Sequence, residues 1–431
     1  MGATASPIVP VWRRLRNPAF WVPATDLLAV LTALALPWST SLVGVFTACW
    51  LGAAGMTFDY RVYVKFAIRP ICALPSAFFV LAVVGTLWSD ASWAERIHAI
   101  GPALKLLFIP ALLFHFMHSS RGMWVFIAFF ASCTLLMLLS WVVAFEPALA
   151  LKPDAQYGVP VKNYIDQSQE FALCAVAPAF LVIALLRAGK IWQAALLGAI
   201  ALSFVVNMMF VSVSRTALVT MPIMLAVFAL LHLKWRTSLA IFSAAIVLAA
   251  LAWATSPKLQ WTTETFFRDY DLYKLQDEPT SIGIRLEFWK KSLRFFAEAP
   301  VIGHGTGSTR GLFEKVSPSV VSGDKVFASG QIIGNPHNQT LNVAVQWGAV
   351  GVIVLYAMWL YHFLLFRGEG LMAWIGLLVV VQNFFTSLFN SHLFDVHEGW
   401  MYVLGVGVAG GTLPGERLRG VAAAAQSAAR P

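Results

Sequence analysis

Long apolar segments, separated by short polar connections, recur along almost the whole chain. Each is close to the roughly 20 residues that a helix needs to cross a bilayer. They lie at residues 22–38, 40–57, 70–88, 100–118, 122–145, 171–187, 190–210, 216–233, 237–255, 338–366, 370–389 and 398–413. The pattern predicts an all-α polytopic membrane protein with about 12 transmembrane helices.

The composition agrees with this prediction. Of the 431 residues, 59% are hydrophobic and 12% are charged, whereas about a quarter of the residues in a soluble domain are charged. These values exclude a secreted disulfide scaffold, a disordered chain and an ordinary cytosolic enzyme. The four cysteines lie in apolar segments and lack C-x-x-C spacing, so we expect neither a disulfide framework nor a zinc site.

The basic residues predict the orientation of the helices. The net charge of +9 could suggest nucleic acid, but Lys and Arg concentrate in alternate short connections, such as 58–69 and 187–190. The opposite short loops contain only Arg96, Lys152 and Lys162. Because basic residues favour the cytoplasmic side, we expect both termini in the cytoplasm, membrane lipids as neighbours and no nucleic-acid partner.

One large polar segment, residues 256–336, is expected to emerge on the far side of the membrane as part of a single membrane domain, 1–431. Within it the stretch Ile284–Ala297 is amphipathic, and its Trp289 and basic residues suit a helix at the headgroup level.

Arg215, in the sequence Ser214-Arg215-Thr216, is the clearest anomaly in the chain. It falls where one predicted span ends and the next begins, at the far-side boundary. Ionisable groups at this depth usually mark functional sites. An interfacial arginine that snorkels to the headgroups is the alternative.

A second feature joins Arg285 and Trp289 to the turn Pro300–Gly307, which contains Gly303, Gly305 and Gly307. Its glycines permit a tight turn that a ligand can approach closely. No Gly-Lys-Ser/Thr follows, so it is not a Walker loop. Taken alone, such a turn is more often structural.

The third feature is Asn335-Pro336-His337-Asn338-Gln339, directly before the tenth span. A helix N-terminus disfavours protonation and so favours the neutral imidazole that a general base needs. A histidine that caps the helix or is hydrogen-bonded at the interface is an equally good interpretation.

Three weaker patterns give less support for a functional site. Asp269-Tyr270-Asp271 matches the Asp-x-Asp of metal-dependent glycosyltransferases, but it lies in the far-side loop, where nucleotide sugars are absent. Gly405-x-Gly407-x-x-Gly410 lies inside an apolar span and is interpreted as helix packing. His392, Asp395, His397 and Glu398 could bind a metal, although polar residues beside a water-filled cleft fit better, and no metal or other cofactor is expected.

The predicted topology brings Arg215, Arg285 and His337 to one membrane face. Two arginines can bind a diphosphate through charge-assisted, bidentate hydrogen bonds. A neutral histidine can take a proton from an attacking hydroxyl.

In this order the motifs resemble the O-antigen ligase/polymerase family. The match consists of Ser214-Arg215-Thr216, Arg285 with Trp289, Pro300–Gly307, and His337-Asn338 through Leu341 to Gly348-Ala349-Val350-Gly351. It covers roughly residues 200–365.

The resemblance implies a GT-C-like glycosyltransferase of the bacterial inner membrane with a periplasmic active site. Such an O-antigen ligase transfers polysaccharide from undecaprenyl diphosphate to the lipid A-core of lipopolysaccharide, without metal and with inversion. By this analogy Arg215 and Arg285 bind the diphosphate and His337 is the catalytic base. Supporting roles are open for Ser214, Asn335, Asn338, Gln339 and His304, the last at a variable position of the glycine turn.

Two alternatives share these features. An O-antigen polymerase or related lipid-linked glycan transferase differs only in its acceptor. A transporter of lipid-linked glycans would also suit many spans, although its two halves would be related, and the large loop here interrupts only one half.

Overall fold

The computed structural model describes residues 17–152, 157–317, 321–322 and 325–428. The first half of this chain contains helices α2 to α11: Pro18–Ala35, Thr40–Thr57, Tyr60–Ala67, Pro70–Val84, Trp93–Leu104, Phe108–His118, Gly122–Phe145, Tyr164–Val176, Ala179–Arg187 and Ile191–Phe210. The second half contains α12 to α19: Arg215–His232, Trp235–Thr255, Pro257–Gln276, Ser281–Glu298, Thr309–Val316, Gln339–Leu365, Leu371–Thr386 and Val396–Ala428. The strands β1, Val321–Ser322, and β2, Lys325–Val326, form a short antiparallel pair.

The prediction of an all-helical, multi-pass membrane protein is confirmed. Within the described residues, ten helical segments are long and apolar enough to cross a membrane. Helix α18 is shorter, and α19, which contains the last predicted apolar segment, is not among the ten. Every predicted apolar segment nevertheless overlaps a helix, and α8 and α3 coincide with 122–145 and 40–57.

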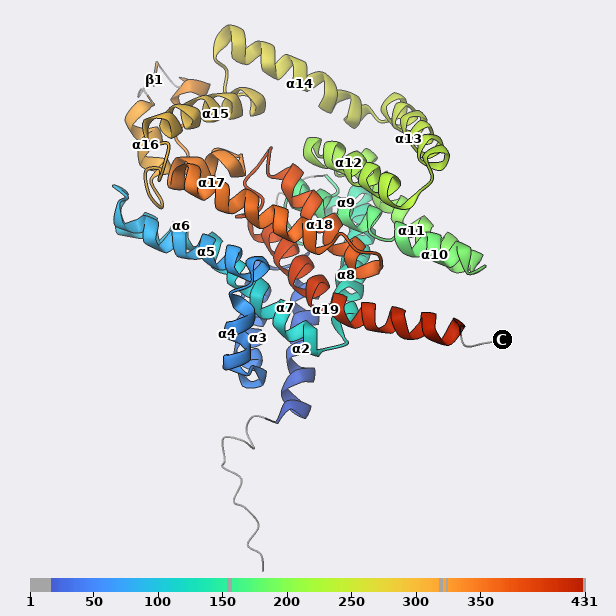
Figure 1. Ribbon diagram of the computed structural model, residues 1–431. Coiled ribbons are helices and arrows are strands. Elements are labelled where there is room, and N and C mark those ends of the chain that lie inside the picture. The colour runs from blue at the N-terminus through green and yellow to red at the C-terminus, as the bar shows by residue number, and fades with distance from the viewer. Residues whose placement is uncertain (1–16, 153–156, 318–320, 323–324, 429–431) are drawn as a thin grey trace, which may run out of the picture.

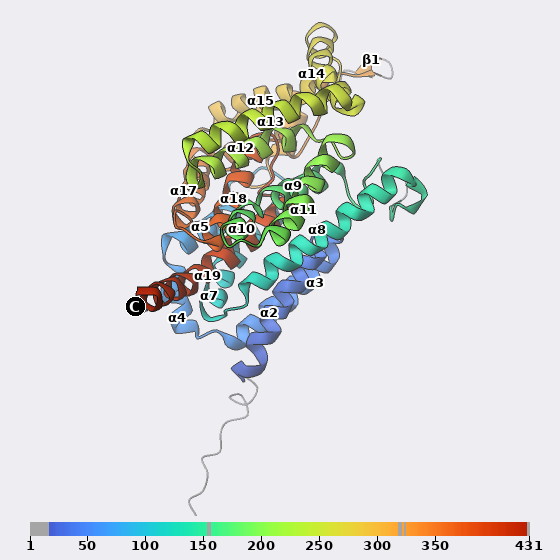
Figure 2. The same ribbon diagram turned by 90° about the vertical axis from the view of Figure 1, so that its right-hand side faces the viewer.

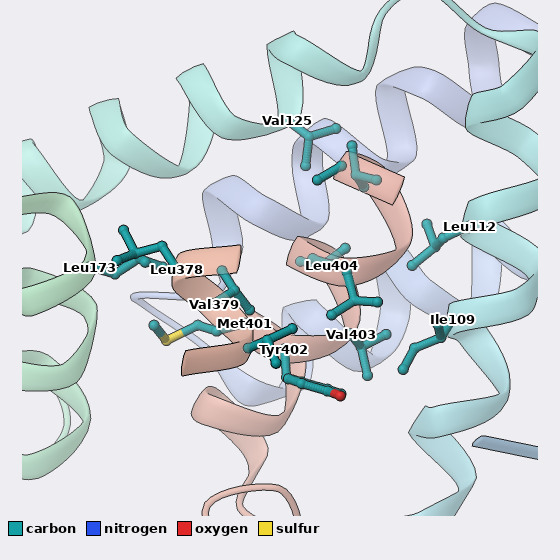
Figure 3. Close-up of a cluster of buried hydrophobic side chains, with 14 of the residues drawn as sticks. Ile109, Leu112, Val125, Leu173, Leu378, Val379, Met401, Tyr402, Val403 and Leu404 are labelled. Atoms are coloured by element: carbon teal, nitrogen blue, oxygen red, sulfur yellow. The ribbon is translucent and has the colours of Figure 1, made fainter. Parts of the chain in front are cut away.

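The core of the helical bundle lies where α7, α8, α9, α18 and α19 meet. Figure 3 shows its aliphatic side chains around α19, including Leu112, Val379 and Leu404. Glycines of α19 allow this contact: a Cβ at Gly405 would lie 2.7 Å from Val379, and one at Gly407 would lie 2.5 Å from Leu112. The interpretation of these glycines as helix packing is therefore confirmed.

Helices α14, α15 and α16 form a cap at one end of the molecule, and the start of α2 lies at the opposite end (Figures 1 and 2). The amphipathic stretch within 256–336 does form a helix, α15, and part of its apolar face packs inside the protein; its position at the headgroup level stays a prediction. Phe288 and Phe295 are buried against Phe313 of α16 and Val345 of α17. Helix α15 thus uses its apolar face to fix the cap to the bundle.

Candidate functional site

The site lies where the cap meets the bundle, and three separate segments contribute to it. Arg215 is the first residue of α12, Arg285 lies in the second turn of α15, and His337 precedes the N-cap residue of α17. The three side chains are close enough to interact electrostatically. Burial is the main cause that lowers the pKa of Arg285 and of His337; the charge of Arg215 adds to the lowering at Arg285, and the charge of Arg285 adds to it at His337.

Arg215 is oriented toward α14. Its Nη2 lies 3.4 Å from the carboxylate oxygen Oδ2 of Asp269, and its guanidinium carbon lies 5.9 Å from the centre of the Phe266 ring. The side chain is 33% exposed, so the ion pair is accessible to solvent and to a competing anion. Ser214 is the N-cap residue of α12, but it is buried and its hydroxyl does not cap the helix.

Arg285 is half-buried and has no ion pair or hydrogen bond with another described residue. Burial is the largest cause that lowers its pKa; the charge of Arg215 adds to this, while Tyr164, at the start of α9, opposes it. A cation without a carboxylate partner, beside a second cation, is an unfavourable arrangement unless an anion binds between them. A phosphate or diphosphate matches this geometry, because guanidinium groups bind its oxygens in pairs.

The backbone of His337 is held in an uncommon conformation. Its φ is 52°, one of two positive values among the described non-glycine residues. Asn335 supports the turn by accepting the backbone N–H of His337 at Oδ1, at 3.0 Å. Asn338 caps α17 by accepting from Leu341 N–H, and its Nδ2 donates to the carbonyl of Leu388. Left-handed backbone that costs free energy clusters at functional sites.

The hydrogen bonds of His337 fix its tautomer. Nδ1 lies 2.7 Å from Oδ1 of Asn390, and the same oxygen accepts the backbone N–H of Ser391 at 3.0 Å. Because a backbone N–H only donates, the Asn390 atom that faces it is the oxygen, so Nδ1 of His337 carries the proton. None of the hydrogen bonds between described residues uses Nε2, which is left with a lone pair to accept a proton.

The surroundings of the ring also keep it neutral. Burial is the main cause that lowers the pKa of His337, and the charge of Arg285 adds to this, while the hydrogen bond to Asn390 opposes it. Phe288 of α15 stacks on the ring at a centroid distance of 6.2 Å and an angle of 24°. The direction of this pKa agrees with the neutral ring predicted at this position.

The glycine turn packs against α17 and contributes no side chain to the group of Arg215, Arg285 and His337. Gly303 has φ of 65°, and a Cβ there would lie 2.5 Å from the backbone carbon of Gln346; Gly348, with φ of 61°, is equally close to Val301. The turn is therefore packed backbone to backbone on the kink of α17. His304 belongs to this packing, since its Nε2 lies 2.8 Å from the carbonyl oxygen of Phe295. No interaction between described residues connects His304 to the three site residues.

Gln339 occupies the first turn of α17 and is fully buried. Its backbone N–H donates to the carbonyl of Ser387 at 2.8 Å, while neither side-chain polar atom has a partner among the described residues. Gln339 thus holds the segment before α17 against the end of α18.

A buried group of ionisable residues lies next to the site. Ligand atoms of His392, Asp395 and Glu398 lie within 4.8 Å of one another, close enough to hold a cation. Burial, with the charges of Arg285 and His337, lowers the pKa of His392 to about 3. The ammonium group of Lys105 donates to the carbonyls of Phe394 and Asp395 and brings positive charge to the group. The expectation that no metal is needed stays a prediction.

Sequence reasoning missed several neighbours. Asp269 was considered only as part of an Asp-x-Asp motif, and its proximity to Arg215, 54 residues away, is a tertiary contact. Asn390 had no signal in the sequence, although it orients the His337 ring. Phe288 was identified only as one apolar position of an amphipathic helix.

The fold and the site together define a multi-pass helical membrane protein with a cationic, histidine-containing site under a helical cap. Residues 200–356 match the model of a family described as O-antigen ligase. The resemblance predicted from the motifs is thereby confirmed for this segment, which contains Arg215, Arg285 and His337.

A second comparison gives a more distant relative. A protein of Haemophilus influenzae described as uncharacterized is 24% identical over 171 residues, which span 38% of this chain and 42% of that protein. The chain therefore aligns with less than half the length of this relative.

Proposed function

We propose that this protein is an O-antigen ligase. It would transfer polysaccharide from undecaprenyl diphosphate to the lipid A-core of lipopolysaccharide, on the periplasmic face of the bacterial inner membrane, with both termini in the cytoplasm. The observation that carries the proposal is one cluster of a half-buried arginine, a second arginine and a neutral histidine, in which Arg285 and Nε2 of His337 have no polar partner among the described residues.

These groups fit one displacement step. Nε2 of His337 removes the proton from the acceptor hydroxyl while its oxygen attacks the anomeric carbon of the donor. The bond from that carbon to the diphosphate oxygen breaks, and the configuration inverts. Arg215 and Arg285 stabilise the charge that develops on the diphosphate, which needs no nucleotide because it is already an activated leaving group. Asn390 holds the His337 ring, and Nδ1–H keeps its proton throughout.

Transfer by the purified protein tests this function. Lipid-diphosphate glycan and lipid A-core are supplied in EDTA, and the product is followed by gel mobility. We expect transfer by the wild type and a loss of about 10²–10⁴-fold in His337→Ala, the usual contribution of a general base. His118→Ala is the matched control, because this exposed histidine ends α7 and bonds only to the carbonyl of Phe114 in its own helix.

Two results would contradict the proposal. Elongation of the lipid-linked glycan without transfer to lipid A-core would identify a polymerase that uses the same three residues. Full activity of His337→Ala would remove the histidine from the reaction, whichever acceptor is used.

A further inference from the structure

A cavity of about 720 Å³ lies on the α6 side of His337. Its walls come from α6, from α16, from the first turns of α17 and from the loop before α19. The volume is within the range of small-molecule sites, roughly 300–1,000 Å³. The polar residues that line it include Glu95, His98, Arg310, Asn335, Asn342 and Gln346.

One wall of this cavity is connected to His337 by hydrogen bonds. Asn335, which accepts the backbone N–H of His337, also accepts from the hydroxyl of Ser391 at 2.7 Å. Asn342 donates to the same hydroxyl at 3.3 Å, and Gln346 donates to Oδ1 of Asn342 at 2.9 Å. This chain of hydrogen bonds ends at Gly307, whose N–H donates to the side-chain oxygen of Gln346. Its amides hold the wall in place, so a ligand there is positioned relative to His337.

The lining favours an uncharged, hydroxyl-rich ligand over a phosphate. Glu95 and Asp395 are acidic, Arg310 is basic, and the other polar side chains are three amides, His98 and the hydroxyl of Thr309. This mixture lacks the excess of positive charge that Arg215 and Arg285 provide for an anion. The Nδ2 group of Asn335 makes no hydrogen bond to another described residue, so it can donate to a hydroxyl.

The outer side of α6 would suit a ligand with a lipid anchor. Trp93 and Ile97, one turn apart, are 64% and 66% exposed, while Glu95, His98 and Ala99 of the same helix line the cavity. An amphipathic helix with an exposed Trp suits the membrane interface. A sugar could therefore enter the cavity while its lipid stays in the bilayer.

We propose that this cavity binds an uncharged terminal sugar of the membrane-anchored acceptor. The inference rests on the proposed function and adds to it a separate acceptor site. The acceptor then reaches the 335–338 segment from α6, and the donor reaches it from α12 and α15. In Figure 1, α6 lies at the left of the molecule and α12 at the right.

Filling the cavity tests the proposal. Ala99→Trp places an indole in the cavity, and Ile97→Trp, on the exposed side of the same helix, is its control. Arg310→Ala removes a polar group from the lining. Its control is Arg294→Ala, because both arginines are exposed and form an i,i+4 pair, with Glu314 and Glu298 respectively. Since Arg310 is exposed, its variant is expected to fold even where Ala99→Trp does not.

We expect Ala99→Trp to raise the KM for lipid A-core at least tenfold, and Arg310→Ala to raise it about threefold, with the KM for the lipid-diphosphate donor unchanged within twofold. The two controls should match the wild type. A rise in the donor KM instead, or no change in either KM, would overturn the proposal.

A binding measurement separates this inference from the proposed function. Calorimetry with lipid-free core oligosaccharide requires no turnover. Binding by the wild type that weakens tenfold in Ala99→Trp supports the cavity even if no transfer is found, in which case the proposed function alone fails. Binding that Ala99→Trp leaves unchanged overturns the cavity assignment even if the protein is a ligase.

Discussion

The two sides of His337 differ in the charge that they present. On the α12 and α15 side, two arginines meet and Arg285 has no described carboxylate partner. On the α6 side, amides and opposite charges line a cavity whose hydrogen bonds are largely internal. The first arrangement is incomplete without an anion, and the second is already rigid without a ligand. This difference is what a transferase needs if it must hold a charged leaving group and an uncharged nucleophile at the same histidine.

Among tests of this difference between the two sides, removal of Arg285 should have the largest effect on the rate. We expect Arg285→Ala to lower kcat about 10²–10³-fold, the usual cost of losing a donor to the charge that develops in the transition state. The KM for the acceptor should stay the same. Steady-state rates with both substrates measure this, and Arg294→Ala, on the exposed face of α15, is the control. A kcat within threefold of the wild type would remove Arg285 from the donor side.

A substitution in the glycine turn should have the second-largest effect, because it lowers the stability of the protein. Gly303→Ala forces a side chain into positive φ and against the backbone of Gln346, at a cost of about 1–3 kcal/mol. We expect a lower melting temperature in detergent and a higher KM for the acceptor. Gly311→Ala, in α16 with open space around its Cβ position, should melt like the wild type. Equal melting temperatures for the two variants would contradict the tight packing of the turn.

Two variants should shift the pH profile in opposite directions. The proposed reaction needs neutral His337, so the rate should fall as the pH drops through its pKa, which lies below the ordinary 6.5. Asn390→Ala removes a hydrogen bond that raises this pKa, so the acidic limb should move to lower pH, with a rate loss of about tenfold from the poorly oriented ring. The residual activity of Arg285→Ala should show the limb at higher pH. Shifts of the same sign would show that His337 is not the titrating group.

The smallest effect should come from the ion pair of Arg215. Asp269→Asn removes the carboxylate partner of Arg215; the pair is open to solvent on the arginine side and is worth about 1 kcal/mol, so the donor KM should fall by up to about fivefold. Asp271→Asn, on the same helix and exposed, is the control. An increase in the donor KM would mean that Asp269 positions Arg215 for the substrate rather than competing with it.

The sequence predicted the membrane helices well because an apolar segment of spanning length has few alternatives in a bilayer. Amphipathicity was less informative: the pattern of α15 shows an apolar face, but not that Phe288 and Phe295 pack against Phe313 of α16. The three polar site residues stood out because charge or histidine at a predicted membrane boundary is unusual. Asn390 and Asp269 did not, because their importance comes from contacts 53 and 54 residues away.

The ion pair between Arg215 and Asp269 also bears on product release. In the proposed reaction the spent lipid diphosphate keeps its negative charges after the sugar has left, so both arginines should bind it at least as well as they bind the donor. Asp269, 3.4 Å from Arg215, can form its ion pair with that guanidinium again as the lipid leaves. We therefore expect the carrier lipid diphosphate to inhibit transfer by competition with the donor, and to do so more strongly in Asp269→Asn than in the wild type.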